Sequence, residues 1–252
     1  MHDAAGLNAL IAQATADPTV AGLILTGSMA TGTGRSWSDY DVRLIVQDDA
    51  DEDAIQRYAQ AAFPMVDLSI MRLSAFATYA AWGTPDAWDR YTFTHAQVLL
   101  DRPGSIRALV EEKGRLPPDQ QSAFAAAMLD AFVNNVYRAL KCQRRDNLLC
   151  VRLEASEAVT HALHLLFAWD GRLKPYPVWL EHDLETAPLS SLPLSGDDLL
   201  CLLTRIVADG DVAAMQDLFT MIVRASAERG YGDTVAAWGE DVGWIRSFVP
   251  AS

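Results

Sequence analysis

Segments with the pattern of β-strands are confined to the first hundred residues of this 252-residue chain. Apolar or alternating runs at 20–26, 41–46, 65–71 and 97–101 predict four strands, with helices over 4–16 and 52–62. After Pro117-Pro118 the pattern becomes helical, over 119–145, 147–168, 178–186, 196–208, 211–229 and 231–240. We therefore expect an α+β chain, in which a mixed sheet with flanking helices spans residues 1–115 and a helical bundle spans 116–252.

Composition and charge narrow the function classes. Hydrophobic residues make up 50% of the chain, which is typical of a globular protein, and the net charge is −13. This charge disfavours a nucleic-acid partner, because binding to phosphate backbones depends on clustered Lys and Arg. It is compatible with an acidic soluble surface, and also with a cationic small molecule or a metal-loaded site.

Other sequence features bear on where the protein works. The N-terminus lacks the pattern of a signal peptide, and no apolar run is long enough to span a bilayer. We therefore expect a cytoplasmic protein without a membrane partner. In a reducing compartment, Cys142, Cys150 and Cys201 are expected to be reduced thiols, since their spacing matches no metal site.

The most informative motif lies between the first two predicted strands. Gly27-Ser28 ends one strand, and Asp39-x-Asp41 opens the next after ten intervening residues. Residues two apart on a strand face the same side, so Asp39 and Asp41 project together and repel each other. A divalent metal would neutralise them, and carboxylate oxygens suit Mg²⁺. A turn with solvated aspartates is the alternative.

A third carboxylate joins this pair if the predicted strands are neighbours. Asp67 lies within the strand at 65–71, where an unpaired buried carboxylate would be costly. If this strand lies beside the one at 41–46, Asp67 belongs to the same metal site. An N-cap or an edge-strand carboxylate is the alternative for Asp67.

These residues together resemble the nucleotidyltransferase superfamily, which includes DNA polymerase beta and the aminoglycoside nucleotidyltransferases. The matching residues are Gly27, Ser28, Gly32, Ser38, Asp39, Asp41 and Asp67. Thr31 stands where many members carry an arginine, and Arg35 is nearby.

The resemblance implies a role for each residue of the motif. Gly27 lets the backbone approach a nucleoside triphosphate, and Ser28 hydrogen-bonds its β- or γ-phosphate at a helix N-terminus. Asp39 and Asp41 hold two Mg²⁺ ions and thereby contact the nucleotide. Asp67 contacts the acceptor-side metal or takes the proton of the acceptor hydroxyl.

The activity implied is Mg²⁺-dependent transfer of a nucleoside monophosphate, with release of pyrophosphate. We expect AMP from ATP as the donor group and a hydroxyl of a small molecule as the acceptor. An aminoglycoside-like polycation would suit an acidic cleft. One alternative is a protein-modifying nucleotidyltransferase that adenylylates a toxin or a regulatory partner. Another is a non-catalytic member that only binds nucleotide.

The helix predicted at 147–168 carries a polar stripe at three- and four-residue steps, made of Glu154, Glu157, His161 and His164. The stripe faces either a cleft or solvent. In kanamycin-type relatives a glutamate of the helical domain acts as general base, which makes Glu154 the second candidate beside Asp67. We favour Asp67, because a mid-strand carboxylate needs a partner and one on a polar stripe does not.

A single basic cluster lies just before this helix, at Arg138, Lys141, Arg144 and Arg145. It either contacts the triphosphate or forms a solvated face that balances nearby acidic residues.

Overall fold

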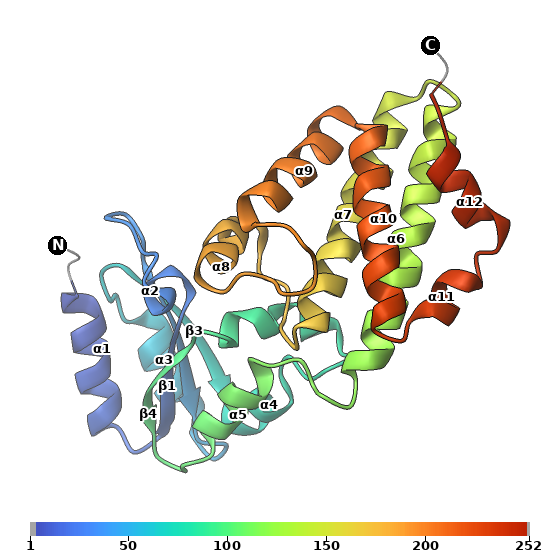
Figure 1. Ribbon diagram of the computed structural model, residues 1–252. Coiled ribbons are helices and arrows are strands. Elements are labelled where there is room, and N and C mark those ends of the chain that lie inside the picture. Colours follow the sequence, from blue (N-terminus) through green and yellow to red (C-terminus); the bar gives the residue numbers. More distant parts are fainter. Residues whose placement is uncertain (1–3, 251–252) are drawn as a thin grey trace. The chain divides into compact units, whose positions relative to one another are not determined.

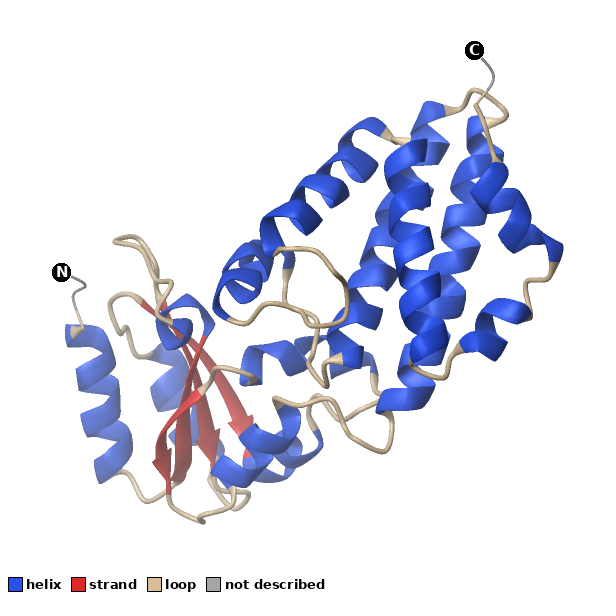
Figure 2. Cartoon of the chain, in the orientation of Figure 1, coloured by secondary structure: helices blue, strands red, loops and turns tan. Residues whose placement is uncertain are grey.

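The computed structural model describes residues 4–250. The chain forms two compact units, residues 1–115 and 116–252, which we call the N-terminal and the C-terminal unit. Within the described residues, strands occur only in the N-terminal unit (Figure 2). The chain is therefore α+β, as predicted.

The N-terminal unit is built on a four-stranded mixed sheet with the order β3-β2-β1-β4 (Figure 1). Its strands are β1 (Val20–Thr26), β2 (Tyr40–Val46), β3 (Val66–Arg72) and β4 (Gln97–Asp101). Strand β1 is antiparallel to β2 and β4, whereas β2 and β3 are parallel. A parallel pair requires a crossover, which helix α3 (Glu52–Gln60) supplies. Strand β3 is therefore an edge strand that pairs with β2 alone.

Side chains alternate between the two faces of the sheet, so the core consists of two layers, one on each face. On one face, Leu23, Val42 and Leu44 pack with apolar residues of α1 (Ala5–Ala16) and α3. On the other face, Ile24 and Ile45 pack with a second group of helices. This group consists of α4 (Leu73–Thr78), the 3₁₀ helix η1 (Pro85–Phe93) and α5 (Ile106–Lys113).

Two buried cations fix this second group of helices. The Arg90 guanidinium, on η1, donates to three backbone carbonyl oxygens at or just beyond the ends of α4 and α5. The Lys113 ammonium donates to two more at the end of α4, and burial lowers the pKa of Lys113. Helix ends leave carbonyl oxygens without intrahelical donors, and the two cations supply donors at the ends of α4 and α5.

The sequence pattern missed this group of helices. It predicted no helix between residues 62 and 119, where the structure forms α4, η1 and α5. These elements are short, and their shape depends on the two buried cations rather than on a local pattern.

The C-terminal unit is entirely helical within its described residues. Its elements are α6 (Gln121–Gln143), α7 (Leu148–Trp169), η2 (Pro177–Trp179), α8 (Leu180–Thr186), α9 (Gly196–Asp209), α10 (Val212–Glu228), α11 (Gly232–Ala236) and α12 (Glu240–Ser247). Phe132 of α6 stacks on Phe219 of α10, with ring centroids 6.2 Å apart, in the centre of the bundle. The helix expected over 231–240 is instead the short α11, and α12 begins after Gly239, whose φ is 53°. None of the described helices is long and apolar enough to cross a membrane.

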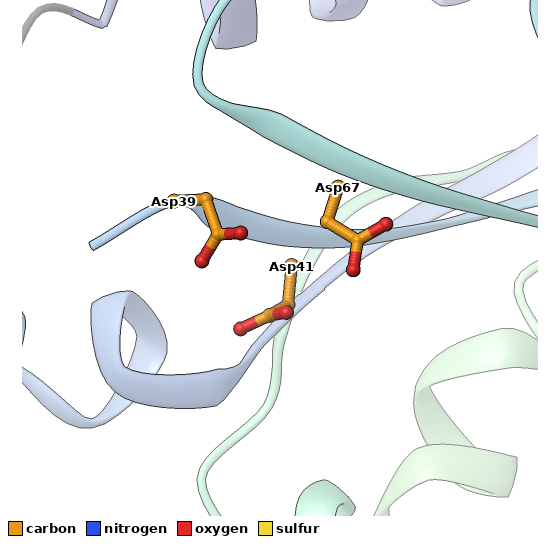
Figure 3. A group of neighbouring side chains, drawn as sticks. All are labelled: Asp39, Asp41 and Asp67. Carbon is orange, nitrogen blue, oxygen red and sulfur yellow. The ribbon is translucent and has the colours of Figure 1, made fainter. Parts of the chain in front are cut away.

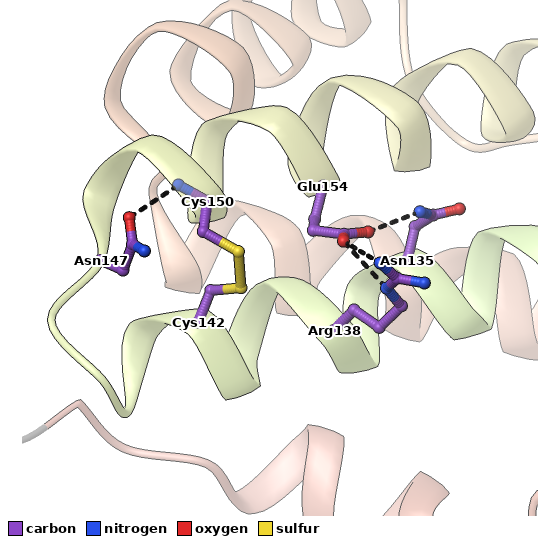
Figure 4. The surroundings of a disulfide bond; sticks show 6 residues. All are labelled: Asn135, Arg138, Cys142, Asn147, Cys150 and Glu154. Carbon is purple, nitrogen blue, oxygen red and sulfur yellow. Dashed lines mark hydrogen bonds and ion pairs between the residues drawn. A yellow bond between two sulfur atoms is a disulfide. The ribbon is translucent and has the colours of Figure 1, made fainter.

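The expectation of three reduced cysteines is wrong for two of them. Cys142, in the last turn of α6, forms a disulfide with Cys150, in the first turn of α7, and their Cα atoms are 5.7 Å apart (Figure 4). The short loop between the helices brings both residues to facing sides of the hairpin, which spacing along the chain does not reveal. Cys201 is free and exposed.

Candidate active site

The structure brings Asp39, Asp41 and Asp67 together at one end of the sheet (Figure 3). Asp39 precedes β2, and Asp41 and Asp67 are the second residues of β2 and β3. The parallel register places Asp41 directly opposite Asp67. One carboxylate oxygen of each residue lies within 4.8 Å of the corresponding oxygens of the other two.

The three carboxylates differ in their surroundings. Asp41 is half-buried, whereas Asp39 and Asp67 are exposed. Burial raises the pKa of Asp41, and the negative charges of Asp39 and Asp67 raise it further, while Arg43 acts in the opposite direction. The protein thus holds mutually repelling carboxylates close together.

The reason given for Asp67 from the sequence needs correction. The argument for Asp67 was that an unpaired buried carboxylate would be costly, but its side chain is exposed on the edge strand β3, as in the edge-strand alternative. Its register with Asp41, rather than burial, makes it part of the cluster.

Gly27 faces Asp41 across the antiparallel strands. Gly27 follows β1 with φ of 70°, a conformation that favours glycine. A Cβ atom built at this position would overlap the Asp41 Oδ2 atom. The glycine therefore keeps a space beside the carboxylate that any larger residue would fill.

The turn that carries Ser28 is short. Helix α2 spans only Gly27–Thr31, so the helix dipole expected to favour a phosphate there is small. Thr31 does not extend outwards as an arginine would: its hydroxyl donates to the Ser28 carbonyl oxygen at 2.9 Å and lies 2.7 Å from the Thr33 hydroxyl. Arg35 is exposed, and its guanidinium lies 5.7 Å from the centroid of the Trp37 ring.

The donor set fits a divalent cation. Three hard carboxylate oxygens converge, their charges repel in the absence of a cation, and Gly27 leaves room beside Asp41. Mg²⁺ is bound by such carboxylates together with water and substrate phosphates.

Glu154, the second candidate general base, lies in a network within the C-terminal unit (Figure 4). One of its carboxylate oxygens accepts from Arg138 Nε at 2.8 Å, and the other accepts from Asn135 Nδ2 at 2.8 Å. His161 Nδ1 lies 3.0 Å from Asn135 Oδ1 and extends the network. With 14% of its side chain exposed, Glu154 is not part of a solvated face.

The rest of the polar stripe is divided between solvent and core. Glu157 is exposed. Burial, with the nearby charges of Lys174 and His161, lowers the pKa of His164 to about 4. His164 is therefore held neutral inside the bundle.

The basic cluster is also partly engaged within this unit. Arg138 pairs with Glu154, the Lys141 ammonium lies 5.0 Å from the Tyr137 ring centroid, and the Arg144 guanidinium lies 6.0 Å from that of Trp244. The ion pair with Glu154 offsets the charge of Arg138, whereas the ring contacts hold Lys141 and Arg144 in place without neutralising them.

An ion pair that was not predicted from the sequence lies on the same side of β2 as the aspartates. Arg43 is two residues beyond Asp41, and its Nη2 atom contacts Asp89 Oδ2 at 2.5 Å. The two-residue spacing could have identified Arg43. Asp89 lies in η1, where no pattern pointed to it.

Comparisons with known proteins agree with this geometry. Residues 10–94 match the model of the nucleotidyltransferase domain family. No curated protein matches the sequence.

A solved structure described as a nucleotidyltransferase-like protein from Exiguobacterium sibiricum 255-15 is similar at 12% identity and a TM-score of 0.46, covering 95% of this chain and 77% of that one. This similarity is too low to assign a function. The matched segment spans α2 and all three aspartates, so residues 10–94 form a nucleotidyltransferase domain.

Proposed function

We propose that the protein transfers a nucleoside monophosphate, AMP from ATP, to a hydroxyl of a small-molecule acceptor and releases pyrophosphate in a Mg²⁺-dependent reaction. The observation that carries this proposal is the convergence of Asp39, Asp41 and Asp67 beside the Gly27-Ser28 turn. Residues 1–115 would form the catalytic domain, and the helical residues 116–252 would form a second domain.

Each residue of the site has a proposed task. Asp39, Asp41 and Asp67 would hold the metal, with two ions expected. Bound there, Mg²⁺ supplies positive charge for the triphosphate and for the attacking and leaving oxygens. Gly27 leaves space for the nucleotide, and the Ser28 hydroxyl donates to a phosphate oxygen. Asp67, exposed at the sheet edge, accepts the proton of the acceptor hydroxyl, with Glu154 as the competing candidate.

Charge supports a small acceptor over a nucleic acid. The chain carries −13 overall, and its basic cluster is partly engaged by Glu154 and by aromatic rings. A polynucleotide acceptor would need a free basic track. A cationic small molecule, such as an aminoglycoside-like compound, suits the acidic surface. We place the reaction in the cytoplasm, although the Cys142–Cys150 disulfide removes one of the arguments for that location.

A labelling experiment tests the proposal. The protein is incubated with Mg²⁺ and each of the four nucleoside triphosphates labelled at the α-phosphate, together with a lysate separated into small-molecule and protein fractions. We expect pyrophosphate release and label in the small-molecule fraction, with ATP preferred. Label in proteins alone would instead support a protein-modifying enzyme. Loss of labelling in Asp39→Asn and Asp41→Asn, with the fold retained, ties the reaction to this site.

A further inference from the structure

A buried ion pair lies directly beneath the three aspartates. Asp41 and Arg43 share one face of β2, and two residues of strand separate them by about 7 Å. The side chains of Arg43 and Asp89 are 17% and 7% exposed, respectively. The pair therefore lies where the open, acidic end of the sheet meets the apolar layer formed with α4, η1 and α5.

Asp89 is held in place from several sides. Its carboxylate accepts hydrogen bonds from the Tyr79 hydroxyl and the Thr92 hydroxyl, each at 2.8 Å. The next residue, Arg90, anchors η1 to the ends of α4 and α5. Asp89 thus offers a fixed negative charge to Arg43.

Arg43 is fixed as firmly. Its guanidinium lies 5.2 Å from the centroid of the Tyr79 ring and 5.3 Å from that of Phe93. Its Nε atom is buried and has no hydrogen-bond partner. The positive charge therefore stays close to the aspartates.

Stability alone is a poor reason for this arrangement. Replacing a buried ion pair by apolar residues of similar volume is often neutral or stabilising. The neighbouring residues of the same layer, Ile24, Ile45 and Phe93, are apolar and would accommodate such a replacement.

We infer that the Arg43–Asp89 pair sets the affinity of the three aspartates for a divalent cation. This inference rests on the metal site of the proposed function. The positive charge of Arg43 repels a cation bound at the aspartates, and the negative charge of Asp89 offsets this repulsion. Removing only Arg43 leaves an extra negative charge and tightens cation binding; removing only Asp89 leaves an extra positive charge and weakens it. Both residues act through the aspartates and are positioning residues.

Calorimetric titration with Mn²⁺ at constant pH and without nucleotide measures this effect directly. We expect Arg43→Gln to tighten binding and Asp89→Asn to weaken it, each on the order of tenfold, as for a unit charge acting on a divalent ion over roughly 8 Å in a water-rich medium. The double variant should return to within about twofold of the wild type, since it restores neutrality.

Two further variants separate charge from structure. Arg43→Lys keeps the charge and should bind Mn²⁺ like the wild type, and circular dichroism establishes that each variant is folded. If a single variant does not fold, the double variant and Arg43→Lys carry the test, and a tenfold change in either would overturn the inference.

The outcomes distinguish this inference from the proposed function. Binding that changes in the same direction in both single variants, or in neither, indicates a merely structural pair and overturns the inference while the metal site stands. A wild type that binds no Mn²⁺, like the Asp41→Asn control, overturns the metal site and the inference together.

Discussion

Asp41→Asn should stabilise the cation-free protein while removing its response to metal. One carboxylate oxygen of each aspartate lies within 4.8 Å of those of the other two. Two unit charges at this distance repel by about 1 kcal/mol where the dielectric constant is close to that of water, as befits a largely exposed cluster. Asp41 takes part in two of the three pairs, so its replacement relieves about 2 kcal/mol at low salt. In a chain of this size that corresponds to a rise in Tm of about 5 °C.

The assay is thermal unfolding followed by circular dichroism, first with a chelator at low ionic strength and then with increasing Mg²⁺. The wild type should gain stability as Mg²⁺ is added, because a ligand that binds only the folded state stabilises it. Asp41→Asn should start higher and gain little. Asp49→Asn is the matched control, since Asp49 is an exposed aspartate of the same unit outside the cluster. The reasoning is refuted if Asp41→Asn is no more stable than the wild type in chelator, or if both respond equally to Mg²⁺.

Three further predictions follow from the site and from the bundle. Gly27→Ala should abolish Mg²⁺ binding, because the new Cβ atom would overlap the carboxylate of Asp41. Gly32 has a similar positive φ of 78° but open space around it, so Gly32→Ala should lose about 1–2 kcal/mol of stability and still bind Mg²⁺. Equal Mg²⁺ affinity of the two variants, measured by calorimetry, would contradict this. Asp67→Asn should lower kcat by about 10²–10⁴ with little change in nucleotide affinity, whereas Glu154→Gln should leave kcat nearly unchanged; the reverse result in steady-state kinetics makes Glu154 the base. The pKa of His164 is about 4 in the folded protein and 6.5 in the unfolded chain, so acid protonates the unfolded chain first and favours unfolding. The contribution of neutral His164 to the free energy of unfolding is therefore complete above pH 6.5 and is lost as pH falls towards 4. Between pH 7 and 5 the loss is about 2 kcal/mol, and His164→Gln should abolish this part of the slope in urea unfolding; an unchanged slope would exclude His164 as its source.

The grouping of the aspartates was predictable because it depends on local rules. Alternation along a strand places Asp39 and Asp41 together, and recognising two neighbouring strands adds Asp67. The same rule would have added Arg43, two residues further on. The exposure of Asp67 was not predictable, because it depends on which strand lies at the sheet edge.

Features that depend on tertiary contacts could not be predicted from the sequence. Asp89 pairs with Arg43 across 46 residues, and nothing near Asp89 in the chain signals a charge partner. The contacts of Glu154 with Asn135 and Arg138 likewise depend on how α6 and α7 face each other. The short helices of residues 73–93 are held by cations that donate to their terminal carbonyl oxygens, Arg90 within the segment and Lys113 beyond it.

The position of β3 at the sheet edge has a consequence for backbone motion at the site. A strand with one hydrogen-bonded neighbour opens locally at lower free energy than a central strand, so amide hydrogens of Val66–Arg72 should exchange with solvent faster than those of Tyr40–Val46. The aspartates are thus divided between a rigid strand and a fraying one. A cation held by both Asp41 and Asp67 would bridge the two strands and slow exchange at the edge. Cation binding and the pairing of β3 with β2 would then be thermodynamically coupled.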